Sequence, residues 1–151
     1  SNNMRIQVLS KDGALLRMFG TAADFTYPRG ITVDPVNGNL WVADSAKDTI
    51  TKWSQAGVKL ATLPIAKGTA ANAISGPFGI AADTERIYVA DTPTHSVKVY
   101  SKTGTFVTKI SQRGTAKGRL LGPDGIIVDK GRLYVMEEGN ERISIFNLRA
   151  S

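Results

Sequence analysis

One pattern of apolar and polar positions occurs three times along this chain. In each copy an apolar run follows a glycine, turns within a few residues, and returns as a second apolar run that ends on a carboxylate. The copies span residues 30–44, 79–91 and 125–137. A proline stands two residues before each glycine, and Pro28, Pro77 and Pro123 are 49 and 46 residues apart. This regular spacing indicates a protein built from repeats.

The rest of the chain alternates polar and apolar positions, which is the period of a half-buried β-strand. Glycine-containing turns, such as Asn37-Gly38, separate the runs and favour hairpins. The pattern predicts antiparallel strands at residues 4–9, 14–19, 31–34, 40–44, 50–53, 58–63, 80–83, 87–91, 97–100, 106–110, 126–129, 133–137 and 143–146. If the strands of one unit are lettered a to d, the chain reads cd, abcd, abcd, abc. We therefore expect an all-β domain over residues 1–151, with helix nearly absent.

Strands a and b are apolar at nearly every position, whereas c and d alternate. Strands buried on both faces read as continuous apolar runs, so a and b are expected near an axis and c and d near a rim. This gradient favours a β-propeller with four-stranded blades. A β-sandwich or an open β-solenoid is the alternative, but a sandwich would not repeat its turns at near-constant spacing. Trp41, Tyr88 and Tyr134 hold one shared place in strand b, and we expect them to pack between blades.

The residues that surround these strands resemble the NHL repeat, a β-propeller family. Its pattern of Pro-x-Gly-Ile, a strand that ends in Val-Ala-Asp, and Asn-x-Arg before an alternating strand is found here. Asn140-Glu141-Arg142-Ile143 and Asn3-Met4-Arg5-Ile6 match the last part, while residues 47–50 and 94–97 depart from it. The resemblance covers essentially the whole chain. It implies three blades per chain, which is half of a six-bladed ring.

Half a ring leaves exposed sheet edges, which invite pairing with another chain. We therefore expect a homodimer in which two copies close one six-bladed ring. Two chains would offer 26 strands for 24 places, so one of two duplicate c strands, residues 5–9 or 143–146, would be displaced. The alternative is that this chain is a piece of a longer six-bladed protein.

Composition narrows the possible chemistry. The chain has no cysteine, which excludes disulfides and thiolate metal sites, and one histidine, His95, which excludes a three-histidine zinc site within one chain. Asp44, Asp91 and Glu137 end successive b strands and are weak candidates for Ca²⁺ ligands; no cofactor is otherwise expected. No apolar run approaches 18 residues and no signal peptide is visible, so no membrane partner is expected and the compartment stays open.

The net charge is +6 with a pI near 9.7. The d–a and b–c loops should share one face of the propeller and carry basic and aromatic side chains. The ligand-binding candidates are Arg29, Phe78, Asp124, Lys47, His95 and Arg119. The first three of them directly follow the repeat prolines. Other basic and aromatic residues are expected nearby, namely Lys67, Arg113, Lys117, Tyr27 and Phe25. This mixture favours a non-enzymatic scaffold for a protein or peptide. The alternatives are single-stranded RNA binding and a metal-assisted hydrolase or lyase at the axial channel.

Overall fold

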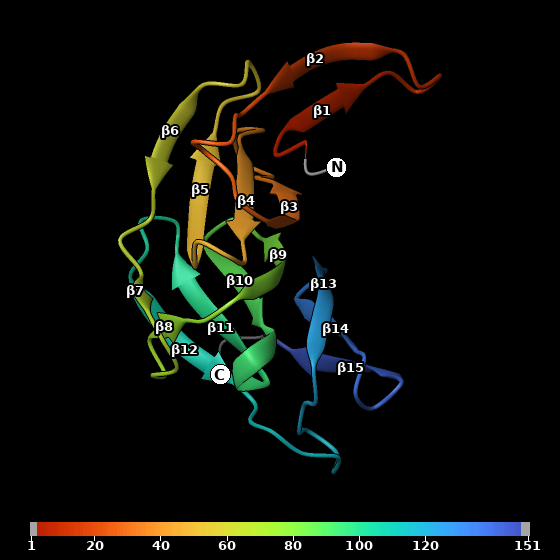
Figure 1. The fold of residues 1–151 in the computed structure, drawn as a ribbon. Coiled ribbons are helices and arrows are strands. Elements are labelled where there is room, and N and C mark those ends of the chain that lie inside the picture. Colours follow the sequence, from red (N-terminus) through yellow and green to blue (C-terminus); the bar gives the residue numbers. More distant parts are fainter. Residues whose placement is uncertain (1–2, 149–151) are drawn as a thin grey trace.

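A computed structural model describes residues 3–148 (Figure 1). Its elements are β1 (Ile6–Leu9), β2 (Leu15–Phe19), β3 (Pro28–Val33), β4 (Leu40–Asp44), β5 (Thr49–Trp53), β6 (Lys59–Thr62), β7 (Ala66–Lys67), β8 (Ala73–Ile74), β9 (Pro77–Ala82), β10 (Arg86–Asp91), the 3₁₀ helix η1 (Thr92–Thr94), β11 (Ser96–Ser101), β12 (Phe106–Ile110), β13 (Pro123–Asp129), β14 (Arg132–Glu137) and β15 (Arg142–Asn147). All thirteen predicted strands are present. No helix in the described range is long and apolar enough to cross a membrane.

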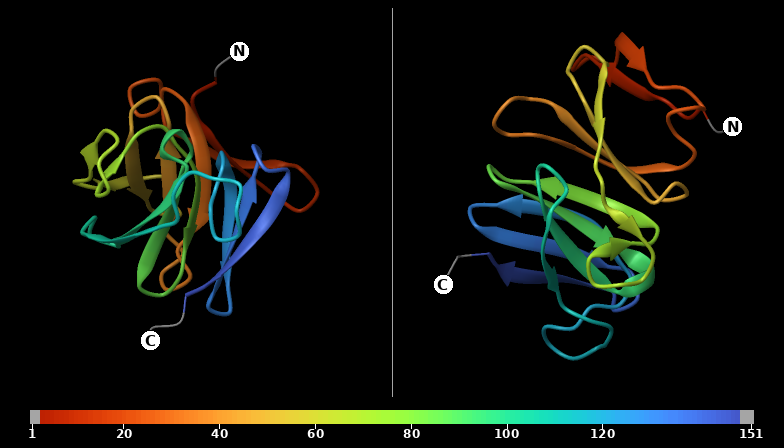
Figure 2. Two further views of the ribbon diagram at one scale, coloured as in Figure 1. Left: turned by 90° about the horizontal axis from the view of Figure 1, so that it is seen from below. Right: turned by 90° about the vertical axis from the view of Figure 1, so that its left-hand side faces the viewer.

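The strands form successive antiparallel sheets that follow the predicted order. Blade 1 is β3-β4-β5-β6, blade 2 is β9-β10-β11-β12, and blade 3 is β13-β14-β15. The pair β1-β2 precedes blade 1 and supplies strands of type c and d. The two-residue strands β7 and β8, which were not predicted, pair in parallel inside the loop that joins blades 1 and 2. The fold is thus an all-β half-propeller, with its sheets arranged as an arc (Figures 1 and 2).

The blades stack through apolar faces, and two of the hydrophobic clusters lie between neighbouring blades. Trp41 and Ala43 of blade 1 pack with Ile80, Ile87 and Val89 of blade 2. The opposite face of blade 2 packs with blade 3 through Ala81, Tyr88, Ala90, Val97 and Val99, which meet Ile126, Leu133 and Val135. Each face of blade 2 is therefore buried by a neighbour, as a propeller requires.

The three equivalent aromatic residues of strand b differ in their surroundings. Trp41 and Tyr88 are buried between blades as expected. Their polar tips donate to the carboxylate that ends strand a, Trp41 Nε1 to Asp34 at 3.1 Å and Tyr88 OH to Asp83 at 2.7 Å. Tyr134 is only partly buried, because its side of blade 3 faces away from blade 2 and no fourth blade covers it within residues 3–148.

The repeated glycines mark places where neighbouring blades touch through their backbones. A Cβ at Gly30 would lie 2.2 Å from the carbonyl oxygen of Phe78, and a Cβ at Gly79 would lie 2.2 Å from that of Asp124. These distances are far inside van der Waals contact, so neither position accepts a side chain. The close approach of the two backbones is the reason for the glycine in each of these innermost strands.

Candidate functional site

The basic and aromatic loop face is centred on Arg29. Its guanidinium carbon lies 4.2 Å from the ring centroid of Tyr27 and 4.6 Å from that of Phe78, so one cation stacks over rings from two blades. Arg29 and Tyr27 are exposed and Phe78 is partly exposed. Among the hydrogen bonds and ion pairs of residues 3–148, none involves the Arg29 guanidinium. Its faces are held by aromatic rings while its N–H donors remain available.

Asp124 occupies the position in blade 3 that Arg29 and Phe78 occupy in blades 1 and 2. Its backbone adjoins Gly79, and its partly exposed side chain lines a hollow on the far side of blade 3. The three residues thus follow one another along the arc, as their common place in the repeat implies. Phe25 was expected near this face but is fully buried, with its ring centroid 5.2 Å from that of Trp53. Because the Phe25 ring packs against the core residue Trp53, it is not part of the exposed loop face.

The other candidates on this face make contacts within the protein. Lys47 Nζ donates to the backbone oxygen of Ala23. His95 Nδ1 accepts the backbone N–H of Gly122 at 3.0 Å, which ties the b–c turn of blade 2 to the loop that leads into blade 3. Arg119 is partly exposed, and its backbone oxygen accepts from Arg142. The structure therefore brings Arg29 and Phe78 together and places these three residues elsewhere, in inter-loop contacts.

The carboxylate at the end of strand b binds the loops around it in every blade. Asp44 accepts backbone N–H groups of Thr26 and Tyr27 from the preceding loop and of Ala46 and Lys47 from the following turn, at 2.6–3.1 Å. The bonds from Ala46 and Lys47 cap the following turn. One buried side chain thereby orders both the loop before and the turn after it.

Asp91 holds the equivalent position in blade 2, but its hydrogen-bond partners differ from those of Asp44. It accepts the backbone N–H of Ser75 at 3.0 Å and the hydroxyl of Thr94 at 2.5 Å, so a side chain of the following turn replaces the turn amides that bind Asp44. Its second oxygen also lies 2.6 Å from Lys98 Nζ, and both side chains are fully buried. Lys98 further donates to the carbonyl oxygens of Ala70 and Ala73 in the loop between blades 1 and 2. A buried ion pair thus anchors that loop.

Glu137 is the equivalent acid of blade 3. It accepts from Leu121 N at 3.1 Å, Asn140 Nδ2 at 2.6 Å and Arg142 Nε at 2.8 Å, and also from the Ser144 hydroxyl. Burial alone would raise the pKa of Glu137, but the hydrogen bonds from Arg142, Ser144, Asn140 and Leu121 outweigh it and hold the pKa below the usual 4.5. This carboxylate is ionised and fully engaged at neutral pH.

The three acids therefore serve separate blades. In the described part of the chain, no group of three or more His, Asp or Glu side chains is placed to hold a metal ion. Each acid has its own donors, in its own blade and in the loop that leads into that blade. The candidacy of Asp44, Asp91 and Glu137 as shared Ca²⁺ ligands gains no geometric support.

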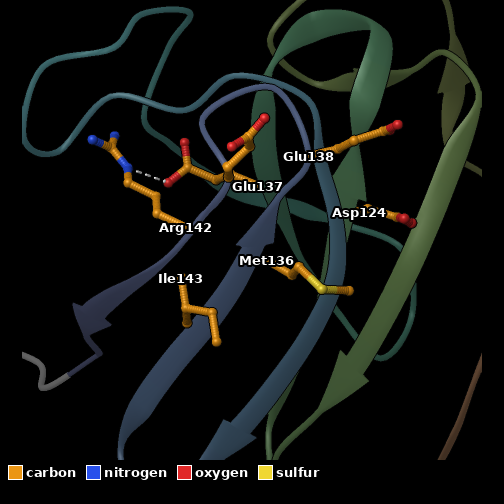
Figure 3. A pocket seen from close by; sticks show the side chains of 7 residues that line it. Asp124, Met136, Glu137, Glu138, Arg142 and Ile143 are labelled. Atoms are coloured by element: carbon orange, nitrogen blue, oxygen red, sulfur yellow. Dashed lines mark hydrogen bonds and ion pairs between the residues drawn. The ribbon is translucent and has the colours of Figure 1, made fainter.

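A hollow of about 640 Å³ lies on the open side of blade 3 (Figure 3). It is lined by Asp124, Met136, Glu137, Glu138, Glu141, Arg142 and Ile143. In Figure 3 Arg142 turns toward Glu137, while Asp124 and Glu138 point away from that pair. The lining combines the apolar side chains of Met136 and Ile143 with acidic side chains that include Asp124 and Glu138. Asp124 and Glu137 were candidates from the sequence, for ligand binding and for Ca²⁺, but the hollow itself was not predicted, although the apolar residues on both faces of the last repeat carried the signal.

Comparisons with known proteins agree with this architecture. A family described as "6-bladed beta-propeller" matches residues 68–151, and the NHL repeat matches residues 25–52. No curated protein sequence matches the chain.

Three solved structures show the same fold at low sequence identity. A nidogen/laminin complex has a TM-score of 0.69 at 20% identity, over 97% of this chain and 52% of that one. A streptogramin B lyase has a TM-score of 0.66 at 21% identity, over 98% and 49%. The hydrazine synthase of Kuenenia stuttgartiensis has a TM-score of 0.63 at 18% identity, over 82% and 33%. The chain thus spans about half the length of the first two structures and 33% of the third. It belongs to the six-bladed β-propeller family and is built from NHL repeats.

Proposed function

We propose that this chain is a non-enzymatic binding scaffold whose loop face recognises a protein or peptide segment with acidic groups. The observation that carries the proposal is the stacking of Arg29 over Tyr27 and Phe78, with its N–H donors unused in the described structure. Arginine and tyrosine dominate binding hot spots because they combine large contact area with directed hydrogen bonds. A guanidinium that aromatic rings already hold in place loses little freedom when it binds a carboxylate.

The charge of the chain supports a ligand with acidic groups. The net charge is +6, and Lys67, Arg113 and Lys117 are exposed on loops that join successive blades. Such a field attracts acidic groups and speeds encounter. Of the structures with this fold, the nidogen/laminin complex is itself an assembly of two proteins.

Selection from a random peptide library displayed on phage tests the proposal. The wild-type chain should enrich peptides that contain Asp or Glu beside an apolar residue. Arg29→Ala and Tyr27→Ala should each weaken binding of a selected peptide by about tenfold or more, as hot-spot truncation does. Val36→Ala is the matched control, since Val36 is exposed in the turn between β3 and β4, away from these residues. Equal binding by wild type and Arg29→Ala would overturn the proposal.

Two other functions remain hypotheses. Single-stranded RNA binding would appear as affinity for a labelled oligouridine that falls steeply with added salt. A metal-assisted hydrolase or lyase would need acids free to hold an ion, whereas Asp44, Asp91 and Glu137 are each bonded to donors of their own blade or of the loop that leads into it. The peptide scaffold has the more specific support, namely the Arg29 cluster.

A further inference from the structure

We propose that the open face of blade 3 docks against blade 1 of a second copy of this chain, which places Asp124 beside Arg29 of the partner subunit. This inference concerns assembly and shares only Arg29 with the proposed peptide site; a guanidinium has five N–H donors, so an ion pair with Asp124 leaves donors for a ligand. The open face is defined here as Ile127, Tyr134, Met136, Ile143 and Ile145.

The interface between blades 2 and 3 is the template for this contact. Blade 2 presents Ala81, Tyr88, Ala90, Val97 and Val99 to blade 3, and all five are buried. The repeat places the open-face residues of blade 3 at the same five positions. All five carry large apolar or aromatic side chains. Four of them, all but Tyr134, are 52–66% exposed. A contiguous apolar sheet face of this kind marks an interaction site.

Gly125 shows how closely the missing neighbour approaches. Gly30 and Gly79 are glycines because a carbonyl oxygen of the next blade occupies the space of a Cβ, 2.2 Å away in each case. At Gly125 that space holds only the end of the Met136 side chain, at 2.9 Å. Met136 is flexible and can move aside. The glycine is thus retained where the backbone of another innermost strand would fit.

Blade 1 carries the complementary surface. Its face directed away from blade 2 exposes Ile31 and Val33 at 52% and 58%, next to a hollow that includes Arg29 and Gly30. The acidic rim of blade 3, formed by Asp124 and Glu138, is opposite in charge to Arg29. Both surfaces belong to one chain: both are apolar sheet faces, and the charges beside them are opposite. A second copy related by a two-fold axis therefore makes both contacts at once.

The docked pair continues the order seen within the chain. Arg29, Phe78 and Asp124 are equivalent residues of successive blades, and Arg29 already stacks on Phe78. The residue after Asp124 in this series is Arg29 of the partner subunit. An ion pair therefore forms where the two copies meet, and it recurs at the second junction.

One strand must be displaced at each junction between the two copies, because β1 and β15 hold the same place in their blades. Arg142 anchors β15 through Glu137 at 2.8 Å and through the backbone oxygens of Thr115 and Arg119. The side chain of Arg5, the matching residue beside β1, makes no hydrogen bond or ion pair within residues 3–148. We expect β1 to be displaced, so that Ile143 and Ile145 replace Ile6 and Val8 of the second copy against its Trp53.

Light scattering with size-exclusion chromatography tests the docking. The wild-type chain should have twice its mass of 16.2 kDa at micromolar concentration. Ile143→Asp should shift it to a monomer with an unchanged circular dichroism spectrum, because Ile143 is 66% exposed in the single chain. Val107→Asp, at an exposed position on β12 of blade 2, which takes no part in the proposed contact, is the control and should stay dimeric. A wild-type monomer, or a dimer that survives Ile143→Asp, overturns the proposal.

A charge exchange tests the named pair. Arg29→Asp and Asp124→Arg should each weaken dimerisation by about tenfold or more, since each places like charges opposite one another. The double variant restores opposite charges at the junction and should recover most of the loss. Failure of the double variant to recover dimerisation would show that Asp124 and Arg29 do not meet. Peptide binding is read separately through Tyr27→Ala, so the two proposals can fail independently.

Discussion

Lys102 of blade 2 reaches back to Asp34 of blade 1, with 2.8 Å between Nζ and Oδ1. The Asp34 side chain is fully buried, whereas that of Lys102 is 19% exposed. Asp34 also accepts the backbone N–H of Val36 and the indole N–H of Trp41. One carboxylate thus closes the turn of its own hairpin, fixes a core tryptophan, and joins two blades through a lysine 68 residues away in sequence.

This ion pair predicts a pH-dependent stability. Burial alone would raise the pKa of Asp34, but the hydrogen bonds from Lys102, Val36 and Trp41 outweigh it and hold the pKa below the usual 3.8. A lowered folded-state pKa contributes stability that is present above the unfolded pKa and is lost as pH falls through the folded value. Lys102→Met should therefore lower the unfolding free energy by about 1–3 kcal/mol at pH 7. Urea unfolding should show this difference shrinking below pH 4, and a constant difference would contradict it.

The buried pair of Lys98 and Asp91 predicts strong coupling. Removal of one member leaves an uncompensated buried charge, which typically costs about 3–5 kcal/mol. Lys98→Met should lose about that much, and Lys98→Met combined with Asp91→Asn should lose clearly less than the sum of the single changes. Chemical denaturation of the four proteins in this double-mutant cycle measures the coupling. Lys109→Met, on the exposed neighbouring strand, is the control. Additive losses would show that the two charges are not coupled.

The equivalent aromatic positions should differ in their energetic roles. Trp41→Ala should cost about 3–5 kcal/mol, as for other buried aromatic truncations, because the ring is fully buried between blades 1 and 2. Tyr134→Ala should cost about 1 kcal/mol or less in the monomer, as for surface-like sites. Thermal unfolding of both variants, with Ile143→Asp present to hold the chain monomeric, makes the comparison. Similar losses at the two positions would contradict the difference in burial.

The glycines at the start of the innermost strands predict a contrast of the same kind. Gly79→Ala places a methyl group 2.2 Å from a backbone oxygen of blade 3, and an overpacked contact of this kind costs about 1–3 kcal/mol or more. Gly125→Ala meets only the flexible end of Met136 and should leave the monomer nearly as stable. It should nevertheless weaken dimerisation, because the docked strand would meet the new methyl group. Unfolding and light scattering on the same samples separate the two effects.

The amino-acid sequence by itself determined the thirteen strands of the blades, their turns and their grouping into blades. Alternation of side chains, glycine turns such as Asn37-Gly38, and the repeat spacing are local signals, and β-strands with tight turns respond to local signals. Even the equivalence of Arg29, Phe78 and Asp124 follows from counting residues after the repeat prolines. These local signals therefore predict the propeller architecture without any knowledge of tertiary contacts.

Contacts between residues far apart in sequence were decided only by the tertiary structure. Phe25 is withdrawn into the core beside Trp53, and His95 binds the backbone of Gly122. Asp44, Asp91 and Glu137 look alike in sequence, yet each is saturated by different donors. The unequal burial of Trp41 and Tyr134 also depends on contacts between blades, which join residues far apart in sequence. A repeat pattern specifies what each blade contains, but the environment of a side chain depends on which surface lies against it.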